Sequence, residues 1–174
     1  MAIAVKQGMP PVGSGDARLL ILGSLPGDAS LAAQRYYAHP SNQFWPLLGK
    51  AIGEELAALG YDDRLGRLAA RGIALWDVVA DASRRGSLDG AIRSPRANPL
   101  AEFVAGHSNL RAVAFNGRTA ATLGRRAFGQ SSGLTLIDLP SSSAAFTRPL
   151  AQKSIDWAVL GDFAAPPISA TSGR

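Results

Sequence analysis

The sequence predicts an α/β fold: a single three-layer α/β/α domain with a central four-stranded parallel sheet. Four short apolar runs indicate buried strands. None of them alternates strictly between polar and apolar residues, which favours parallel strands that are covered on both faces. Helical patterns lie between the runs, as expected when helices connect parallel strands. A length of 174 residues suits one domain with a substantial core.

The predicted strands are short and aliphatic. They are Arg18–Leu22 (RLLIL), Ile73–Trp76 (IALW), Arg111–Phe115 (RAVAF) and Leu134–Leu139 (LTLIDL). Apolar residues at helical spacing predict helices over residues 44–59, 62–70, 99–105, 118–128 and 149–160. Another helix is expected to start after Asp28 or Ser30. The sequence therefore alternates strand and helix along most of its length.

Both ends of the chain are aperiodic and rich in Gly, Pro, Ala and Ser. We therefore expect residues 1–17 and 161–174 to be flexible tails around a folded domain of residues 18–160. No apolar run reaches the length of a membrane span, and the N-terminus lacks the apolar region of a secretory signal. These features predict a cytoplasmic protein without a membrane partner.

Composition excludes several kinds of chemistry. The chain has no cysteine, which excludes disulfides, iron–sulfur clusters and cysteine nucleophiles. His39 and His107 are far apart and lack carboxylates at ligand spacing, so we predict no metal site and no cofactor, with an all-oxygen magnesium site as the remaining alternative. The net charge of +5 comes from fifteen arginines and three lysines against thirteen acidic residues. Such a balance suits a phosphate-bearing partner or reflects a high-GC genome.

Each predicted strand is followed at once by a polar or turn-rich segment. These segments are GSLPGDAS (residues 23–30), WDVV (76–79), NGRTA (116–120) and PSSSAAF (140–146). Ligands of open parallel α/β sheets bind beyond the carboxyl ends of the strands. The four segments therefore predict one site at that edge.

The first segment fits neither G-x-G-x-x-G nor G-x-x-x-x-G-K-[ST]. The longer stretch that it begins, GSLPGDASLAAQRYYAHPSNQFWPLLG (residues 23–49), resembles the first sequence block of the uracil-DNA glycosylase superfamily. It looks most like the mismatch-specific uracil/thymine branch and its hypoxanthine-DNA glycosylase relatives. The resemblance continues in ALWDVV, RRGSLDGAI, FNGRTA and LPSSSAA, and spans roughly residues 18–160.

This resemblance implies a monofunctional DNA glycosylase that acts in base excision repair. Such an enzyme flips a deaminated base out of DNA and hydrolyses its glycosidic bond. We expect uracil as the first substrate and hypoxanthine as the second, with a monomer acting on DNA that contains such a base. No lysine lies in a pocket motif, so a Schiff-base lyase step is not expected.

The resemblance assigns Phe44 as the ring that stacks on the flipped base and Asn116 as the amide that reads its edge. We expect the two to face each other across a slot sized for one base. The alternatives are a core aromatic for Phe44 and an Asn-Gly turn for Asn116. The other residues expected to bind the base are Gly23, Leu25, Pro26, Tyr37 and His39.

The catalytic group is less directly specified. Leu25 stands where the mismatch-specific branch has a water-positioning asparagine, which leaves Asn42, Asp77 and the Ser24 hydroxyl as candidates. Asn42 either orients water or caps the helix that starts at Phe44. Asp77 either activates water or anchors a loop through backbone N–H groups. His39 either shapes the pocket or makes a structural hydrogen bond.

The last segment resembles the loop that grips DNA. It supplies the predicted DNA-binding residues Ser141, Ser142, Ser143, Ala144, Phe146 and Arg148. Relatives read Ser-Pro-Ala-Asn where this chain has SAAF (residues 143–146). Phe146 is therefore a candidate wedge, or the segment is a flexible serine-rich loop.

Arg84, Arg85, Arg93 and Arg96 lie together in the chain, either for contact with the DNA backbone or as a solvated basic loop. Leu25 and the altered 143–146 segment also allow a non-catalytic module that binds damaged DNA. A general nucleotide-binding α/β domain has only the fold in its favour.

Overall fold

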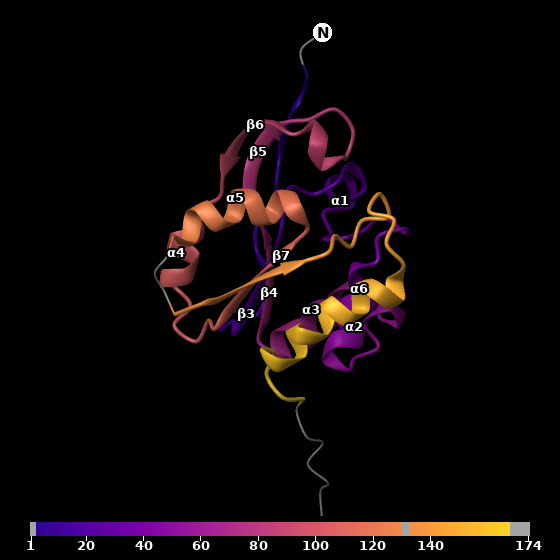
Figure 1. Cartoon of the computed structure of the whole chain (residues 1–174), viewed down its shortest axis with the longest axis vertical. Helices are drawn as coiled ribbons and strands as arrows, with labels where there is room; N and C mark the ends of the chain where they lie inside the picture. Colours follow the sequence, from indigo (N-terminus) through magenta and orange to yellow (C-terminus); the bar gives the residue numbers. More distant parts are fainter. Residues whose placement is uncertain (1–2, 130–132, 168–174) are drawn as a thin grey trace, which may run out of the picture.

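The computed structural model, which describes residues 3–129 and 133–167, contains a five-stranded sheet with helices on both faces (Figure 1). The strand order is β2-β4-β3-β7-β8. The bounds are β2 Val12–Gly13, β3 Leu19–Gly23, β4 Ile73–Asp77, β7 Ala112–Asn116 and β8 Thr135–Leu139. The four predicted strands are present and pair in parallel, but β2 adds an antiparallel edge. The predicted sheet of four parallel strands was therefore incomplete.

Helices cover both faces of this sheet. They are α1 Asp28–Ala33, α2 Phe44–Ile52, α3 Tyr61–Ala70, α4 Leu100–Ala105, α5 Arg118–Phe128 and α6 Leu150–Trp157. Short 3-10 turns add η1 Leu56–Ala58, η2 Asp89–Ala91 and η3 Ala158–Asp162. The helix predicted over residues 44–59 ends early, because Gly53 adopts a left-handed conformation (φ 72°) and its N–H bonds the Gly49 carbonyl.

The two faces of the sheet bury separate cores. Leu19 and Ile21 of β3 pack on one side with residues of α2, α3 and α6, whereas Leu20 and Leu22 pack on the other with residues of α4 and α5. Both faces of every central strand are thus covered by apolar side chains. This double coverage explains why the strands read as continuous apolar runs.

A second, antiparallel sheet was not predicted. It has the order β1-β5-β6, with β1 Val5–Gln7, β5 Val79–Ser83 and β6 Arg93–Ala97. β5 begins two residues after β4 ends, so the second sheet extends from the carboxyl edge of the first. In Figure 1 it lies above the central sheet, beside α1.

The prediction of a flexible tail over residues 1–17 was wrong for the described part. Residues 5–7 and 12–13 form strands, and Met9 and Ala17 are buried. These strands are too short to show a pattern of their own, and they are held by long-range pairing with β5 and β4.

The second predicted tail begins later than expected. η3 runs to Asp162, Ala164 is buried, and the Ala165 N–H bonds the Arg71 carbonyl. Residues 168–174 of that prediction lie outside the described residues. No helix within the described ranges has the length and apolar character needed to cross a membrane.

Candidate active site

A cavity of about 520 Å³ opens beyond the carboxyl ends of the parallel strands, as the loop pattern predicted. Gly23, Asp77 and Asn116 reach it from the ends of β3, β4 and β7. The remaining lining comes from residues 24–30, 36, 37, 39, 41, 42, 87–89 and 141–146. Of the predicted site residues, only Phe44 and Arg148 do not line it.

The prediction for Phe44 was wrong in its geometry. The ring is fully buried, with Trp45 and Trp157 packed edge-on against it at centroid distances of 5.1 and 5.6 Å. Tyr37 lies flat on Phe44, with centroids 3.7 Å apart and ring planes 6° from parallel. Tyr37 therefore separates Phe44 from the cavity and is the ring available to stack on a ligand.

Tyr37 is held in an unusual conformation. Its φ of 53° lies in the left-handed region that bulky residues rarely adopt, so the surrounding structure must enforce it. The ring ends beside Gly23, where an added Cβ would come within 3.0 Å of Tyr37 Oη and 2.6 Å of Asp77 Oδ1. Glycine at position 23 thus allows both side chains to approach the strand end.

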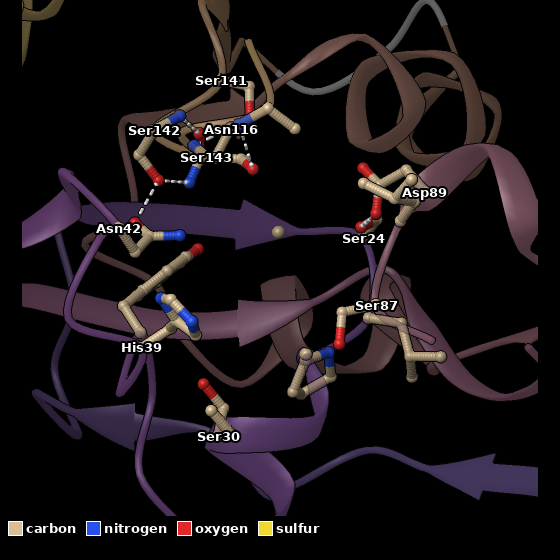
Figure 2. Close-up of a pocket in the computed structure, with 18 of the residues that line it drawn as sticks. Ser24, Ser30, His39, Asn42, Ser87, Asp89, Asn116, Ser141, Ser142 and Ser143 are labelled. Carbon is tan, nitrogen blue, oxygen red and sulfur yellow. Dashed lines mark hydrogen bonds between the residues drawn. The ribbon is translucent and has the colours of Figure 1, made fainter. Parts of the chain in front are cut away.

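Two amide side chains meet through Ser142. Asn116 Nδ2 donates to Ser142 Oγ at 2.9 Å, and Asn116 Oδ1 accepts from the Ser142 N–H at 2.9 Å. Ser142 Oγ donates in turn to Asn42 Oδ1 at 2.8 Å. Figure 2 shows these residues together on one wall. The bonds fix which end of each amide is engaged, and Asn116 retains one N–H beyond its bond to Ser142.

Both interpretations of Asn42 agree with this geometry. Its Oδ1 accepts from the Phe44 N–H at 3.0 Å and so holds the start of α2. Within residues 3–129 and 133–167 its Nδ2 has no hydrogen-bond partner, and in Figure 2 it points away from Ser142 toward the cavity. Asn42 can therefore cap the helix through its oxygen and donate to a ligand through its nitrogen.

The opposite part of the cavity is acidic. Ser24 Oγ donates to Asp89 Oδ1 at 2.5 Å, and Asp77 Oδ2 is buried without a hydrogen-bond partner in the described structure. Burial, followed by the neighbouring Asp89 charge, raises the pKa of Asp77 to about 7, against the opposing effect of Arg84. Burial also raises the pKa of Asp89. A buried carboxyl that titrates near neutral pH is a frequent feature of catalytic sites.

Comparison with known proteins identifies the family. The family model described as Uracil DNA glycosylase superfamily matches residues 10–161. The chain belongs to this superfamily. This confirms the predicted resemblance.

Two relatives of known name support the same family. The hypoxanthine DNA glycosylase of Methanosarcina barkeri (strain Fusaro / DSM 804) is 40% identical over 155 residues, which cover 88% of this chain and 96% of the relative. That of Methanosarcina acetivorans is 39% identical over 153 residues, with the same two coverages. These relatives and the family confirm the predicted enzyme class, a DNA glycosylase that hydrolyses N-glycosidic bonds.

A solved structure supports the fold. The solution NMR structure of a candidate uracil DNA glycosylase from Methanosarcina acetivorans is 37% identical in sequence. The match covers 91% of this chain and 97% of that one, with a TM-score of 0.79. The α/β architecture of the two proteins is therefore shared.

A buried arginine holds the backbone of the loop that follows β3. Arg84 donates from Nη1 to the Leu25 carbonyl at 3.2 Å and from Nη2 to the Pro26 carbonyl, and its side chain is fully buried. Leu25 lines the cavity but also packs on Val79 and Ala82. Arg84 therefore is not available for contact with DNA. Arg85, Arg93 and Arg96 of the predicted basic cluster are exposed.

The rim on the amide wall is formed by the loop after β8. Ser141 and Ser143 Oγ atoms accept backbone N–H groups within the loop, and the buried Lys153 donates to the Ser143 carbonyl at 3.1 Å. Phe146 is exposed and lies under the Arg148 guanidinium, 5.3 Å from the ring centroid. The loop is thus internally bonded, and its aromatic tip faces solvent.

His39 and the turn at residues 87–89 complete the lining. The His39 Nδ1 accepts the Ser41 N–H at 3.1 Å, so this ring has the structural bond that was one of its two predicted roles. The residues of this turn were not among the predicted site residues. Its SLDG sequence signals a turn, but only the pairing of β5 with β6 carries that turn to the cavity.

Proposed function

We propose that the protein removes deaminated bases from DNA as a monofunctional glycosylase, with hypoxanthine as the first substrate and uracil as the second. From the sequence alone we expected the opposite order, with uracil first. The names of the two Methanosarcina relatives support hypoxanthine, because each is about 40% identical and aligned over nearly its whole length.

One observation carries this proposal: the Tyr37 ring and the Asn42–Ser142–Asn116 bonds lie on the same cavity. A flipped base needs a ring that replaces its lost stacking, and polar groups that read its edge. Tyr37 offers the ring. The amide nitrogens of Asn42 and Asn116 offer N–H donors to the carbonyl oxygens that hypoxanthine and uracil both carry, and to the ring-nitrogen acceptors that only hypoxanthine adds.

The amide donors also suit the chemical step. When the glycosidic bond breaks, negative charge develops on the leaving base and positive charge on the sugar. Fixed N–H donors stabilise the first charge, because they need not reorganise as it forms. In this proposal Asp77 acts in its ionised form, by stabilising the cationic sugar or accepting a proton from the attacking water. A single-turnover rate that rises between about pH 6 and pH 8 is expected, because the pKa of Asp77 is about 7.

The absence of a lyase step follows from the lysines. Among the described residues, no lysine lines the cavity. Lys153 contacts the loop after β8, but its amine is buried and donates to Gln43 Oε1 at 2.9 Å and to the Ser143 carbonyl. Lys6 is paired with the Asp28 carboxylate. Hydrolysis that leaves an intact abasic site is therefore the proposed outcome.

The test uses purified protein and oligonucleotides that contain one hypoxanthine or one uracil. Alkali cleaves the strand wherever a base has been released. We expect alkali-dependent cleavage with hypoxanthine at a higher rate than with uracil, and no cleavage without alkali. Intact strands with both substrates at stoichiometric protein would refute the activity, whereas faster uracil release would refute only the order.

A further inference from the structure

The cavity carries an exposed apolar side chain on each of two walls. Within the described parts of the chain, seven large apolar side chains are exposed, and Leu88 and Phe146 are the two of them that line the cavity. Phe146 belongs to the loop after β8. Leu88, which is 62% exposed, belongs to the turn that connects β5 and β6 in the second sheet. Single exposed apolar side chains are common on protein surfaces, so what distinguishes these two is their position at the cavity.

The turn that carries Leu88 is rigidly held on both sides. Ser87 Oγ accepts the Asp28 N–H at 2.9 Å, and Asp89 Oδ1 accepts the Ser24 hydroxyl at 2.5 Å. The Leu88 carbonyl accepts the Ala91 N–H at 3.1 Å, at the start of η2. Leu88 itself belongs to none of the apolar clusters. The backbone is therefore anchored to the first loop while the side chain points away from the core.

The anchors also fix where Leu88 stands. Figure 2 shows Ser87, Asp89 and Ser24 on the wall opposite Asn42 and Ser142. Phe146 follows Ser142 in the chain and belongs to that second wall. Leu88, between Ser87 and Asp89 in the chain, therefore lines the cavity across from the loop that carries Phe146.

We propose that Leu88 is a wedge that inserts into the base stack of duplex DNA beside the flipped nucleotide. The proposal rests on the proposed function and adds a DNA contact from the second sheet. An apolar side chain inserted at a base step unstacks it and fills the space that the flipped base leaves, which also removes the side chain from water. Exposed Arg85 and Arg93 flank the turn in sequence and suit the phosphates on either side.

The test compares Leu88→Ala with the wild type on one hypoxanthine oligonucleotide, as a duplex and as a single strand. A wedge is needed only where a stack must be opened. We expect the single-turnover rate on the duplex to fall about tenfold or more, and the rate on the single strand to stay within about twofold, as the size of unstacking free energies implies. Leu88→Met, which keeps an apolar side chain of similar volume, should restore the duplex rate.

Ile155→Ala is the matched control. Ile155 is also an exposed aliphatic residue, but it lies on α6 and does not line the cavity. Its removal should change neither rate. Thermal unfolding of all variants should match the wild type, because these side chains are exposed.

A second measurement separates this proposal from the choice of substrate. The fluorescence of 2-aminopurine next to the target base reports unstacking without base release. Leu88→Ala should reduce the fluorescence rise on binding, whichever base is excised. Equal losses of rate on duplex and single strand, or an unchanged duplex rate with an unchanged fluorescence rise, would overturn the wedge.

Discussion

The two walls of the cavity differ in how completely their polar groups are satisfied. On one wall, Asn116, Ser142 and Asn42 bond one another at 2.8–2.9 Å and carry no net charge. On the other, the carboxyl group of Asp77 is buried and that of Asp89 is half-buried, and one Asp77 oxygen has no hydrogen-bond partner in the described structure. The side chains of the first wall therefore satisfy one another's hydrogen bonds. On the second wall, burial disfavours the charged form of both carboxyl groups.

This difference suggests that one wall recognises the base and the other takes part in the chemical step. Satisfied amides are rigid and present fixed donors, which suits recognition of a planar base. An unsatisfied carboxyl with a pKa near 7 is costly to the fold, so its retention points to chemistry. Changes on the amide wall should therefore reduce base release without a gain in stability, whereas a change on the acidic wall should stabilise the protein.

The largest effect is expected from Asn116→Ala. The variant removes an edge-reading donor and leaves Ser142 without its partner amide. We expect the single-turnover rate to fall by about 10²–10³, the size found when one donor to a developing anion is removed. Base release is measured by alkali cleavage, and circular dichroism checks the fold. A folded variant with normal turnover would refute the assigned role.

Tyr37 should contribute through its ring rather than its hydroxyl. Tyr37→Ala removes the stacking platform, which is worth about 1–3 kcal/mol per base, so we expect the rate to fall about 10–100-fold. Tyr37→Phe should retain nearly full activity, because the buried Oη has no hydrogen-bond partner in the described structure. Phe44→Leu is an informative comparison, since it should lower the melting temperature through lost packing. A larger loss from Tyr37→Phe than from Tyr37→Ala would contradict this assignment.

Ser142 should act by positioning the two amides. Ser142→Ala keeps the backbone N–H that binds Asn116 Oδ1 but removes the hydroxyl between the amides. We expect the rate of base release to fall about tenfold, the value of one hydrogen bond, with little change in the Kd for DNA. Ser142→Thr should restore the rate, because it returns the hydroxyl.

The control for Ser142 is Ser154→Ala, which removes another buried, hydrogen-bonded hydroxyl away from the cavity. It should leave the rate unchanged. If Ser142→Ala weakens DNA binding as much as it slows base release, the hydroxyl contacts DNA rather than positioning the amides.

The last comparison concerns stability. Between its ordinary pKa of 3.8 and its raised pKa of about 7, Asp77 binds a proton in the folded state that the unfolded state has lost. Its contribution to the free energy of unfolding therefore falls as the pH rises through this window. Asp77→Asn should raise the melting temperature at pH 8 by about 2–4 °C, equivalent to about 1 kcal/mol for a domain of this size. Thermal unfolding at pH 4 should show little difference, and a constant gain across pH would contradict the raised pKa.

The central sheet was predictable because its strands are local signals. Apolar runs of five residues and the helices between them encode β3, β4, β7 and β8 directly. The second sheet was not predictable in the same way. Val5–Gln7 is a three-residue strand with no pattern, and Arg93–Ala97 is fully exposed, so neither carries the burial signal by which a strand is recognised in a sequence.

The candidate site was predicted in composition but not in detail. The strand pattern placed Asp77 and Asn116 at the site, because residues at the ends of buried parallel strands meet at one edge, and the family resemblance added Asn42. It misplaced the stacking ring, because Tyr37 and Phe44 both occur in one aromatic segment. Which of two rings covers the other depends on the backbone conformation at Tyr37, and that is set by packing.

The sequence by itself determined the parallel α/β core, the edge where the loops converge and the family, since each is written in local patterns and motif spacing. The tertiary structure alone decided that Tyr37 faces the cavity, that Ser142 joins two amides, and that Leu88 stands opposite the loop of Phe146. The two hydrogen bonds of the Ser142 hydroxyl, for example, join it to residues 26 and 100 positions away in the sequence, Asn116 and Asn42. Local propensity cannot specify such contacts, because they form only when packing brings distant segments together.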